Sequence, residues 1–187
     1  MFKLFSLFKK NKKIFNNNSN FLVVDKDLVE FTKKIVDSTK NSEFRIAIVT
    51  NNEYPEMYNI LSTEELVFIR SSPYTTITEI KEFFKQNMAG KLKDKKEGLL
   101  IFDYDTFIPN YNKNSIINTL LMSKAVNMNC IIFGSSIDVL EERTLNRIDY
   151  YIVSDKDITS SKFKEIKITG KNILLTKKED GYDSVSL

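Results

Sequence analysis

Short apolar runs that do not alternate with polar residues most constrain what this chain can fold into. Strands of an antiparallel sheet with one wet face alternate, whereas strands of a parallel sheet are buried on both faces and read as continuous apolar runs. Segments with helical spacing of their apolar residues separate the runs. The sequence therefore predicts an α/β fold: a doubly wound, mostly parallel sheet with helices on both faces.

The predicted strands and helices alternate along the chain. The strands are Phe21–Val24, Phe44–Thr50, Leu66–Ile69, Leu99–Phe102, "CIIFGSS" at 130–136 and Tyr150–Val153. The helices are Leu28–Val36, Ile77–Met88, Ile116–Val126 and Asp138–Arg147. Ile166–Ile168 and Ile173–Leu175 predict a closing hairpin around Gly170 and Lys171.

The length and the distribution of polar residues predict one domain with short additions. A chain of 187 residues can bury one sizeable core, which we assign to residues 21–178. A basic leader with an asparagine-rich hinge is expected at 1–20, because "NNNSN" at Asn16–Asn20 has the composition of a loop. A flexible tail is expected at 179–187.

Composition excludes several classes of function. Histidine is absent, so the commonest general base near neutral pH and the commonest metal ligand are missing. The single cysteine, Cys130, lies in an apolar run, which argues against a disulfide framework or a zinc site and favours a reducing compartment. No apolar stretch reaches the roughly 20 residues needed to span a bilayer. We expect a cytoplasmic, intracellular protein, peripheral to a membrane or within a virion at most.

The leader, "MFKLFSLFKKNKKIF", has the pattern of a basic amphipathic helix. It carries no acid, and its lysines explain the positive formal charge of the chain, +3. Such a helix could bind an anionic membrane surface or the phosphates of DNA. Alternatively, its apolar face docks on the domain, or the segment stays partly disordered. The lysines are Lys3, Lys9, Lys10, Lys12 and Lys13.

Polar residues lie at the carboxyl ends of four predicted strands, at Asp25, Thr50, Asp103 and Ser135. Ligands of parallel sheets bind beyond the carboxyl ends of the strands. The stretch "GLLIFDYDTFIP" adds a second acid, Asp105.

The acid pair has two interpretations. Because side chains alternate along a strand, Asp103 and Asp105 would share a face while Tyr104 points away, and the pair could then hold Mg²⁺. Alternatively, the two acids solvate a strand end and begin a turn before Pro109.

The segment "GLLIFDYD…NSIINTLLMSKAVNMNCIIFGSSIDVLEERTLNRIDYYIVSD" resembles the core of FtsK/HerA-type P-loop ATPases. It is most similar to the genome-packaging ATPases of large DNA viruses of the poxvirus kind. In this family a Walker B strand ends in an acidic pair, a helix follows, and the next strand ends in a polar sensor residue. The upstream "FRIAIVTNNEYPEMYNIL" is similar to the family's second strand and its tyrosine-bearing loop. The resemblance covers residues 21–165.

The resemblance implies a role for each matching residue. Asp103 matches the magnesium-linked carboxylate of Walker B, although Tyr104 occupies the place of the second acid, which here is Asp105. Ser135, or Ser136 beside it, matches the sensor. Arginines at two further positions match the family's arginine finger, which reaches a neighbouring subunit's phosphate. They are Arg143 and Arg147, and each could instead pair with Glu141, Glu142 or Asp149.

The phosphate cradle of the family is missing from the sequence. A P-loop needs glycine-rich backbone, a lysine and a Ser or Thr between its strand and its helix. Here "FLVVDKDLVEF" passes from the strand to the helix through Asp25, Lys26 and Asp27 without a glycine. Two like charges about 5 Å apart repel by roughly 3 kcal/mol at an effective dielectric near 20. We expect Asp25 or Asp27 to cap the helix instead.

These observations predict a catalytically inactive ATPase-like protein that acts by binding. It would serve as a subunit in DNA packaging or translocation, or in a virion or membrane-associated assembly, with a protein partner or further copies of itself. No cofactor is expected except Mg²⁺ at Asp103. One alternative is an enzyme, either an active packaging-type ATPase or a Mg²⁺-dependent nuclease or phosphoryl transferase that gathers Asp103, Asp105 and Asp25. The other is a plain α/β domain that binds protein partners.

Overall fold

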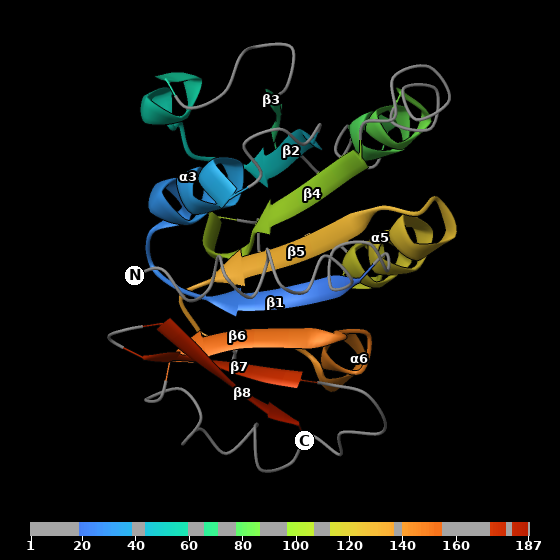
Figure 1. The fold of residues 1–187 in the computed structure, drawn as a ribbon. Coiled ribbons are helices and arrows are strands. Elements are labelled where there is room, and N and C mark those ends of the chain that lie inside the picture. The colour runs from blue at the N-terminus through green and yellow to red at the C-terminus, as the bar shows by residue number, and fades with distance from the viewer. Residues whose placement is uncertain are drawn as a thin grey trace.

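An eight-stranded sheet forms the centre of the fold (Figure 1). Its spatial order is β3-β2-β4-β5-β1-β6-β7-β8, and all neighbours are parallel except β7 and β8. The predicted α/β class with a mostly parallel sheet is confirmed. The strands are β1 (Asn20–Val24), β2 (Phe44–Thr50), β3 (Leu66–Arg70), β4 (Glu97–Asp103), β5 (Asn129–Gly134), β6 (Tyr150–Ser154), β7 (Ile173–Lys178) and β8 (Gly181–Ser186).

The computed structural model describes residues 19–38, 44–59, 66–70, 78–86, 97–106, 113–136, 140–154, 173–178 and 181–186. The leader with its five lysines therefore lies outside the described residues, and its predicted amphipathic helix stays a prediction. Within the described residues, none of the helices has the length and apolar character needed to cross a membrane.

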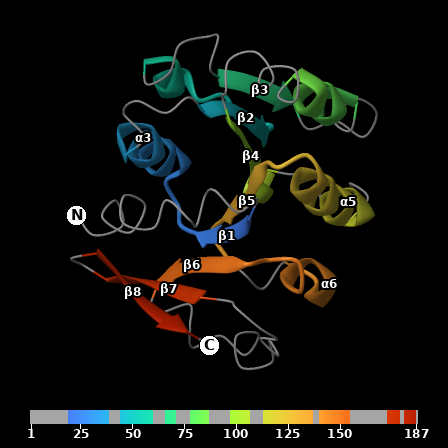
Figure 2. The ribbon, with the colours of Figure 1, turned by 45° about the vertical axis from the view of Figure 1, so that its right-hand side comes forward.

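Helices cover both faces of the sheet, as the sequence predicts (Figure 2). The face that carries Phe21 and Val23 packs against α3 (Leu28–Ser38) and the 3₁₀ helix η1 (Pro55–Asn59). We call it the α3 face. The opposite face packs against the helical residues 78–86, α5 (Lys113–Ala125) and α6 (Glu142–Leu145).

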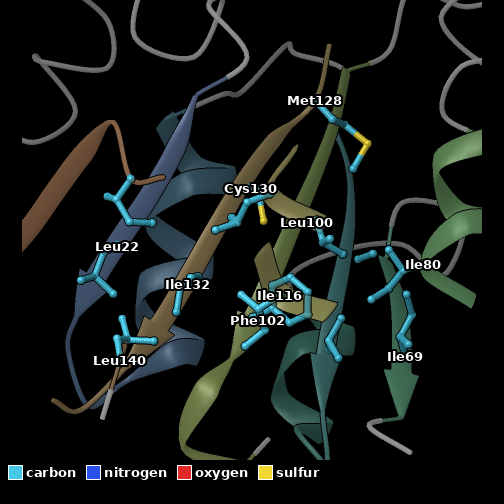
Figure 3. Close-up of a cluster of buried hydrophobic side chains, with 14 of the residues drawn as sticks. Leu22, Ile69, Ile80, Leu100, Phe102, Ile116, Met128, Cys130, Ile132 and Leu140 are labelled. Carbon is cyan, nitrogen blue, oxygen red and sulfur yellow. The ribbon is translucent and has the colours of Figure 1, made fainter. Parts of the chain in front are cut away.

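Alternating side chains of each strand enter the two cores. On the face opposite α3, Leu22 of β1, Leu100 of β4 and Ile132 of β5 meet Ile80 and Ile116 from the helices (Figure 3). Each of these side chains is at most 4% exposed. Full burial of an aliphatic side chain contributes roughly 1.5–3 kcal/mol. Burial on both faces is why the strands read as continuous apolar runs.

One buried group in α3 lacks a partner. Thr32 is 0% exposed, and no hydrogen bond reaches its Oγ1. A buried unpaired hydroxyl costs roughly 1–3 kcal/mol. We therefore expect Thr32→Val, which keeps the shape and removes the hydroxyl, to raise the free energy of unfolding by about 1 kcal/mol in urea denaturation. The reverse sign would mean that Oγ1 has an acceptor. Thr32→Ser, which keeps the hydroxyl and removes the methyl group, is the control and should destabilise.

A polar network joins β1, α5 and the segment before β6 at the amino edge of the sheet, where the strands begin. Asn20 is 1% exposed. Its Nδ2 donates to the carbonyls of Leu120 (3.3 Å) and Arg147 (3.0 Å), and its Oδ1 accepts from Ser123 Oγ at 3.1 Å. Its backbone N–H donates to Asp149 Oδ2 at 2.7 Å. The predicted hinge 16–20 is therefore wrong at its end, because Asn20 begins β1 in the core.

The C-terminal hairpin differs from the prediction. β7 lies between β6, which is parallel to it, and β8, which is antiparallel to it. Both edges of β7 are thus occupied, so the hairpin predicted around Gly170 and Lys171 is wrong, and β7 pairs with β8 instead. Ile166–Ile168 lies outside the described residues. The tail predicted at 179–187 contains β8, whose register pairs Ile173 with Ser186.

The helix predicted at Asp138–Arg147 is shorter in the structure. Within the described residues of that segment, the helix α6 covers only Glu142–Leu145. Leu145 and Ile148 pack into the core on the face opposite α3, so the segment is held by burial more than by helix length.

Candidate functional site at the carboxyl edge

Four strand ends meet at one edge of the sheet. The register pairs Val24 at the end of β1 with Gly134 at the end of β5, and Asp103 at the end of β4 with Phe133. Figure 1 shows β1, β4 and β5 pointing to the same side. Asp25, Thr50, Asp103 and Ser135 therefore lie at this carboxyl edge, as the sequence predicts.

Asp103 is a buried carboxylate at the centre of this edge. It ends β4 and is 3% exposed. Leu99 and Ile101, four and two residues earlier, pack on the α3 face, so strand alternation directs Asp103 to that face as well. Its Oδ2 accepts hydrogen bonds from Thr50 Oγ1 at 2.6 Å and from Tyr54 Oη at 2.7 Å. Among the described residues, both hydrogen bonds to this side chain end on Oδ2.

The two donors come from β2 and the loop that follows it. Thr50 Oγ1 also accepts from the backbone N–H of Asn52 at 3.0 Å and lies 3.1 Å from Thr106 Oγ1. Asn51 donates from its backbone to Thr106 Oγ1 (3.2 Å) and from Nδ2 to the Thr106 carbonyl (2.9 Å). The network fastens the loop after β2 to the turn after β4.

Tyr54 was missed as a site residue, although the sequence placed it in a tyrosine-bearing loop. The pKa of Tyr54 is raised from 10.0 to about 12, mainly by burial and secondly by the hydrogen bond to the Asp103 carboxylate. Burial and the nearby Asp149 carboxylate likewise raise the pKa of Tyr151 to about 12. A raised folded-state pKa means that the stability contributed by the protonated phenol is complete below pH 10 and is lost as the pH rises toward 12.

We therefore expect Tyr54→Phe to lose less stability than the wild type between pH 10 and pH 12. At neutral pH the same variant should be less stable, because Asp103 loses a donor. The melting temperature, followed across this pH range, measures both effects. Tyr151→Phe is the comparison: Tyr151 donates to the Leu145 carbonyl at 2.8 Å, away from Asp103, so the two changes should add. An unchanged alkaline slope in Tyr54→Phe contradicts the assignment.

Asp105 does not share a site with Asp103. β4 ends at Asp103, and Tyr104–Thr106 form the 3₁₀ turn η2, so the alternation expected for the acid pair does not apply. Asp105 turns to β5, where its Oδ2 accepts the backbone N–H of Ser135 at 2.7 Å. A Cβ on Gly134 would lie 3.2 Å from Asp105 Oδ1 and 3.5 Å from Tyr104 Cβ. The glycine thus permits η2 to pack closely over the end of β5.

The connection from β1 to α3 consists of Asp25, Lys26 and Asp27. Asp25 donates its backbone N–H to the Gly134 carbonyl at 3.0 Å. Its Oδ1 accepts the N–H of Lys26 at 2.7 Å. Asp27 Oδ1 accepts the N–H of Glu30 at 2.8 Å, which is a helix N-cap. The cap predicted for Asp25 or Asp27 is therefore made by Asp27.

The two arginines do not meet Asp103 within this chain. The backbone carbonyl of Arg147 accepts from Asn20 at the amino edge, and α6, which carries Arg143, lies toward that edge (Figure 1). Both arginines are exposed. Asp149, predicted as one of their partners, instead pairs with Lys124 at 2.7 Å. Their arginine-finger role stays a prediction about a neighbouring subunit.

No group of three or more metal-ligating residues exists within the described ranges. The three-acid magnesium cluster of Asp103, Asp105 and Asp25 is therefore not formed. Asp103 remains a single buried carboxylate, and its side chain accepts two hydroxyl donors.

Comparisons with known proteins bear on the fold. B204, the DNA-packaging ATPase from Sulfolobus Turreted Icosahedral Virus, is 8% identical, with a TM-score of 0.48 over 89% of this chain and 80% of that chain. The cytoplasmic domain of EssC is 10% identical, with a TM-score of 0.51 over 91% of this chain and 40% of that chain. The fold is P-loop NTPase-like. Both similar structures are of the FtsK/HerA-like kind that the sequence resembles.

At these identities the likeness shows the fold alone. This chain spans less than half of the EssC chain. Neither a protein-family model nor a curated protein matches the sequence.

Proposed function

We propose that this chain is a catalytically inactive ATPase-like protein that acts as a binding or structural subunit. Its setting would be DNA packaging or translocation, or a virion or membrane-associated assembly. The observation that carries the proposal is the β1–α3 turn. Its backbone N–H groups at Asp25 and Lys26 bond to the protein itself, and its two acids cap the turn and the helix.

The residues present do not fit a bound triphosphate. A phosphate cradle offers unpaired backbone N–H groups and positive charge. Here the turn has three residues, two of them acids, and no glycine. Both acids would repel phosphate oxygens, and a single lysine, Lys26, opposes them. No step of hydrolysis can be derived from this turn.

Asp103 supports the same proposal. A Walker B carboxylate that serves Mg²⁺ must offer its oxygens to the metal's ligand shell. Asp103 instead uses Oδ2 to hold Thr50 and Tyr54, 2.6 and 2.7 Å away. Hydrogen bonds to a charged group contribute roughly 1.5–3 kcal/mol each, so displacing these donors by a metal would cost stability.

Thermal denaturation with and without Mg²⁺ and ATP tests the proposal. A ligand at 100 times its dissociation constant adds about 2.7 kcal/mol, which raises the melting temperature of a domain of this size by roughly 5–10 °C. We expect no shift with Mg²⁺-ATP and no phosphate release. A magnesium-dependent shift that Asp103→Ala abolishes would overturn the proposal in favour of an active ATPase. A shift with Mg²⁺ alone would favour a metal enzyme.

We propose that the leader attaches the domain to an anionic surface. Lysines near an anionic leaflet contribute about 1 kcal/mol each. The test replaces Lys3, Lys9, Lys10, Lys12 and Lys13 by Gln in the full chain. Co-sedimentation with phosphatidylserine vesicles and gel shift with duplex DNA are the two measurements. Loss of vesicle binding identifies a membrane as the surface, and loss of DNA binding identifies DNA. Retention of both kinds of binding contradicts the proposal. Truncation should spare Ser19, whose N–H donates to Asn129 Oδ1 at 3.0 Å.

A further inference from the structure

A hollow of about 380 Å³ opens beside the Asp103 network, at the carboxyl ends of β2 and β3. The register places Thr50 and Arg70, the last residues of the two strands, side by side in its lining. The loop after β2 forms the wall. The hollow is separated from the β1–α3 turn by β4 and β5 in the sheet order, so it is not the place of a phosphate cradle.

Aromatic side chains are the main feature of the hollow. Tyr58 of η1 is 56% exposed and lies against Phe68 of β3, with ring centroids 5.3 Å apart and planes tilted by 59°. Tyr54 also lines the hollow, and its hydroxyl is fixed by Asp103. Tyr58 therefore presents an exposed ring on a rigid support, which is an arrangement that accepts a flat aromatic group by stacking.

Polar groups complete the lining. Asn51 and Asn52 are held in place by their bonds to Thr106, Thr50 and Tyr54. Their side-chain oxygens add acceptor groups to the lining. Arg70 is exposed at the rim and supplies one positive charge. These groups match the chemistry of a nucleotide unit. The amides can hydrogen-bond to the edge of a base, the aromatic rings can stack on the face of the base, and the guanidinium can pair with a phosphate.

We propose that this hollow binds an unpaired base of single-stranded nucleic acid, stacked on Tyr58, with Arg70 on the adjacent phosphodiester. The charge of the hollow favours this ligand over a free nucleoside triphosphate. Arg70 and Glu53 are its only charged lining residues of the described chain, and their charges cancel, so the singly charged phosphodiester beside Arg70 is tolerated better than a multiply charged triphosphate. A duplex is disfavoured as well, because its bases are already stacked and paired.

Fluorescence anisotropy of a labelled oligothymidine with the full chain tests the proposal. Stacking of one base contributes about 1–3 kcal/mol, which corresponds to a roughly 5- to 140-fold change in the dissociation constant. Tyr58→Ala should weaken binding within this range, and Tyr58→Phe should restore it. Arg70→Ala should reduce the slope of log K against log salt by about 0.7, the value for one phosphate of a single strand. Tyr58→Ala should leave that slope unchanged.

The leader is identical in every variant, so differences between variants report the hollow alone. Val67→Ala is the matched control, because Val67 is exposed on the same strand but on the opposite face; it should bind as the wild type does. Equal affinity of wild type and Tyr58→Ala, or an unchanged salt slope in Arg70→Ala, overturns the proposal. Competition by free thymidine monophosphate at the concentration of oligonucleotide phosphate would also overturn it, in favour of a mononucleotide site.

Discussion

Replacing Asn20 by Ala is expected to lower the free energy of unfolding by about 3 kcal/mol. The change removes three buried side-chain hydrogen bonds, to the carbonyls of Leu120 and Arg147 and from the hydroxyl of Ser123. Ser123 and Leu120 keep their bond to each other at 2.9 Å, so the Arg147 carbonyl loses most. Each buried polar group left unpaired costs roughly 1–3 kcal/mol, and relaxation or entering water recovers part of the sum. The midpoint of urea denaturation at constant slope measures the loss.

The control for this prediction is Asn118→Ala. Asn118 is an exposed residue of α5, so its replacement should change stability by no more than about 0.5 kcal/mol. If Asn20→Ala behaves like Asn118→Ala, the amino-edge network contributes nothing and β1 is held by its apolar side chains alone.

Replacing Asp103 by Ala is expected to destabilise the protein by about 2–4 kcal/mol. Thr50 and Tyr54 lose a charged acceptor, and the loop after β2 keeps only its bonds to Thr106 in the turn after β4. The sign of this change in stability distinguishes a carboxylate kept for catalysis from one that anchors the structure. Carboxylates kept for catalysis are commonly a cost to stability, so their removal is neutral or stabilising, whereas a structural anchor destabilises when removed.

Asp105→Ala is the matched comparison for Asp103→Ala. Asp105 is exposed and accepts one hydrogen bond, from the Ser135 N–H, so we expect a loss of about 1 kcal/mol or less. A stabilised Asp103→Ala variant, measured by the same denaturation, would contradict the anchoring role and support retained chemistry at this edge.

The strands could be predicted from the sequence because burial on both faces leaves a local signature. "FRIAIVT" matches β2 residue for residue, and the apolar run before Asp103 lies within β4. The predicted strands also gave the positions of the strand ends. The sequence therefore predicted that Thr50, Asp103 and Ser135 lie at the same edge of the sheet. Parallel pairing brings the carboxyl ends of such runs to one side of the sheet.

The parts that the sequence did not predict depend on partners far along the chain. Asn20 looks like a loop residue until α5 and the segment before β6 provide its acceptors, 100 and 127 residues away. Tyr54 and Asp103 are 49 residues apart and meet only because β2 and β4 are neighbours. In the sequence, the signal for this contact was a tyrosine that follows a predicted strand ending in Thr50.

The three-residue length of the β1–α3 turn also limits how the sequence can change. Substitutions at Asp25, Lys26 or Asp27 can remove charge, but they cannot supply the extra backbone that encloses an anion. Only an insertion of several codons could do that, and lengthening a surface loop is thermodynamically inexpensive, about 0.6 kcal/mol for each doubling. A gain of nucleotide binding at this turn would therefore require a change in chain length, a rarer genetic event than a point mutation.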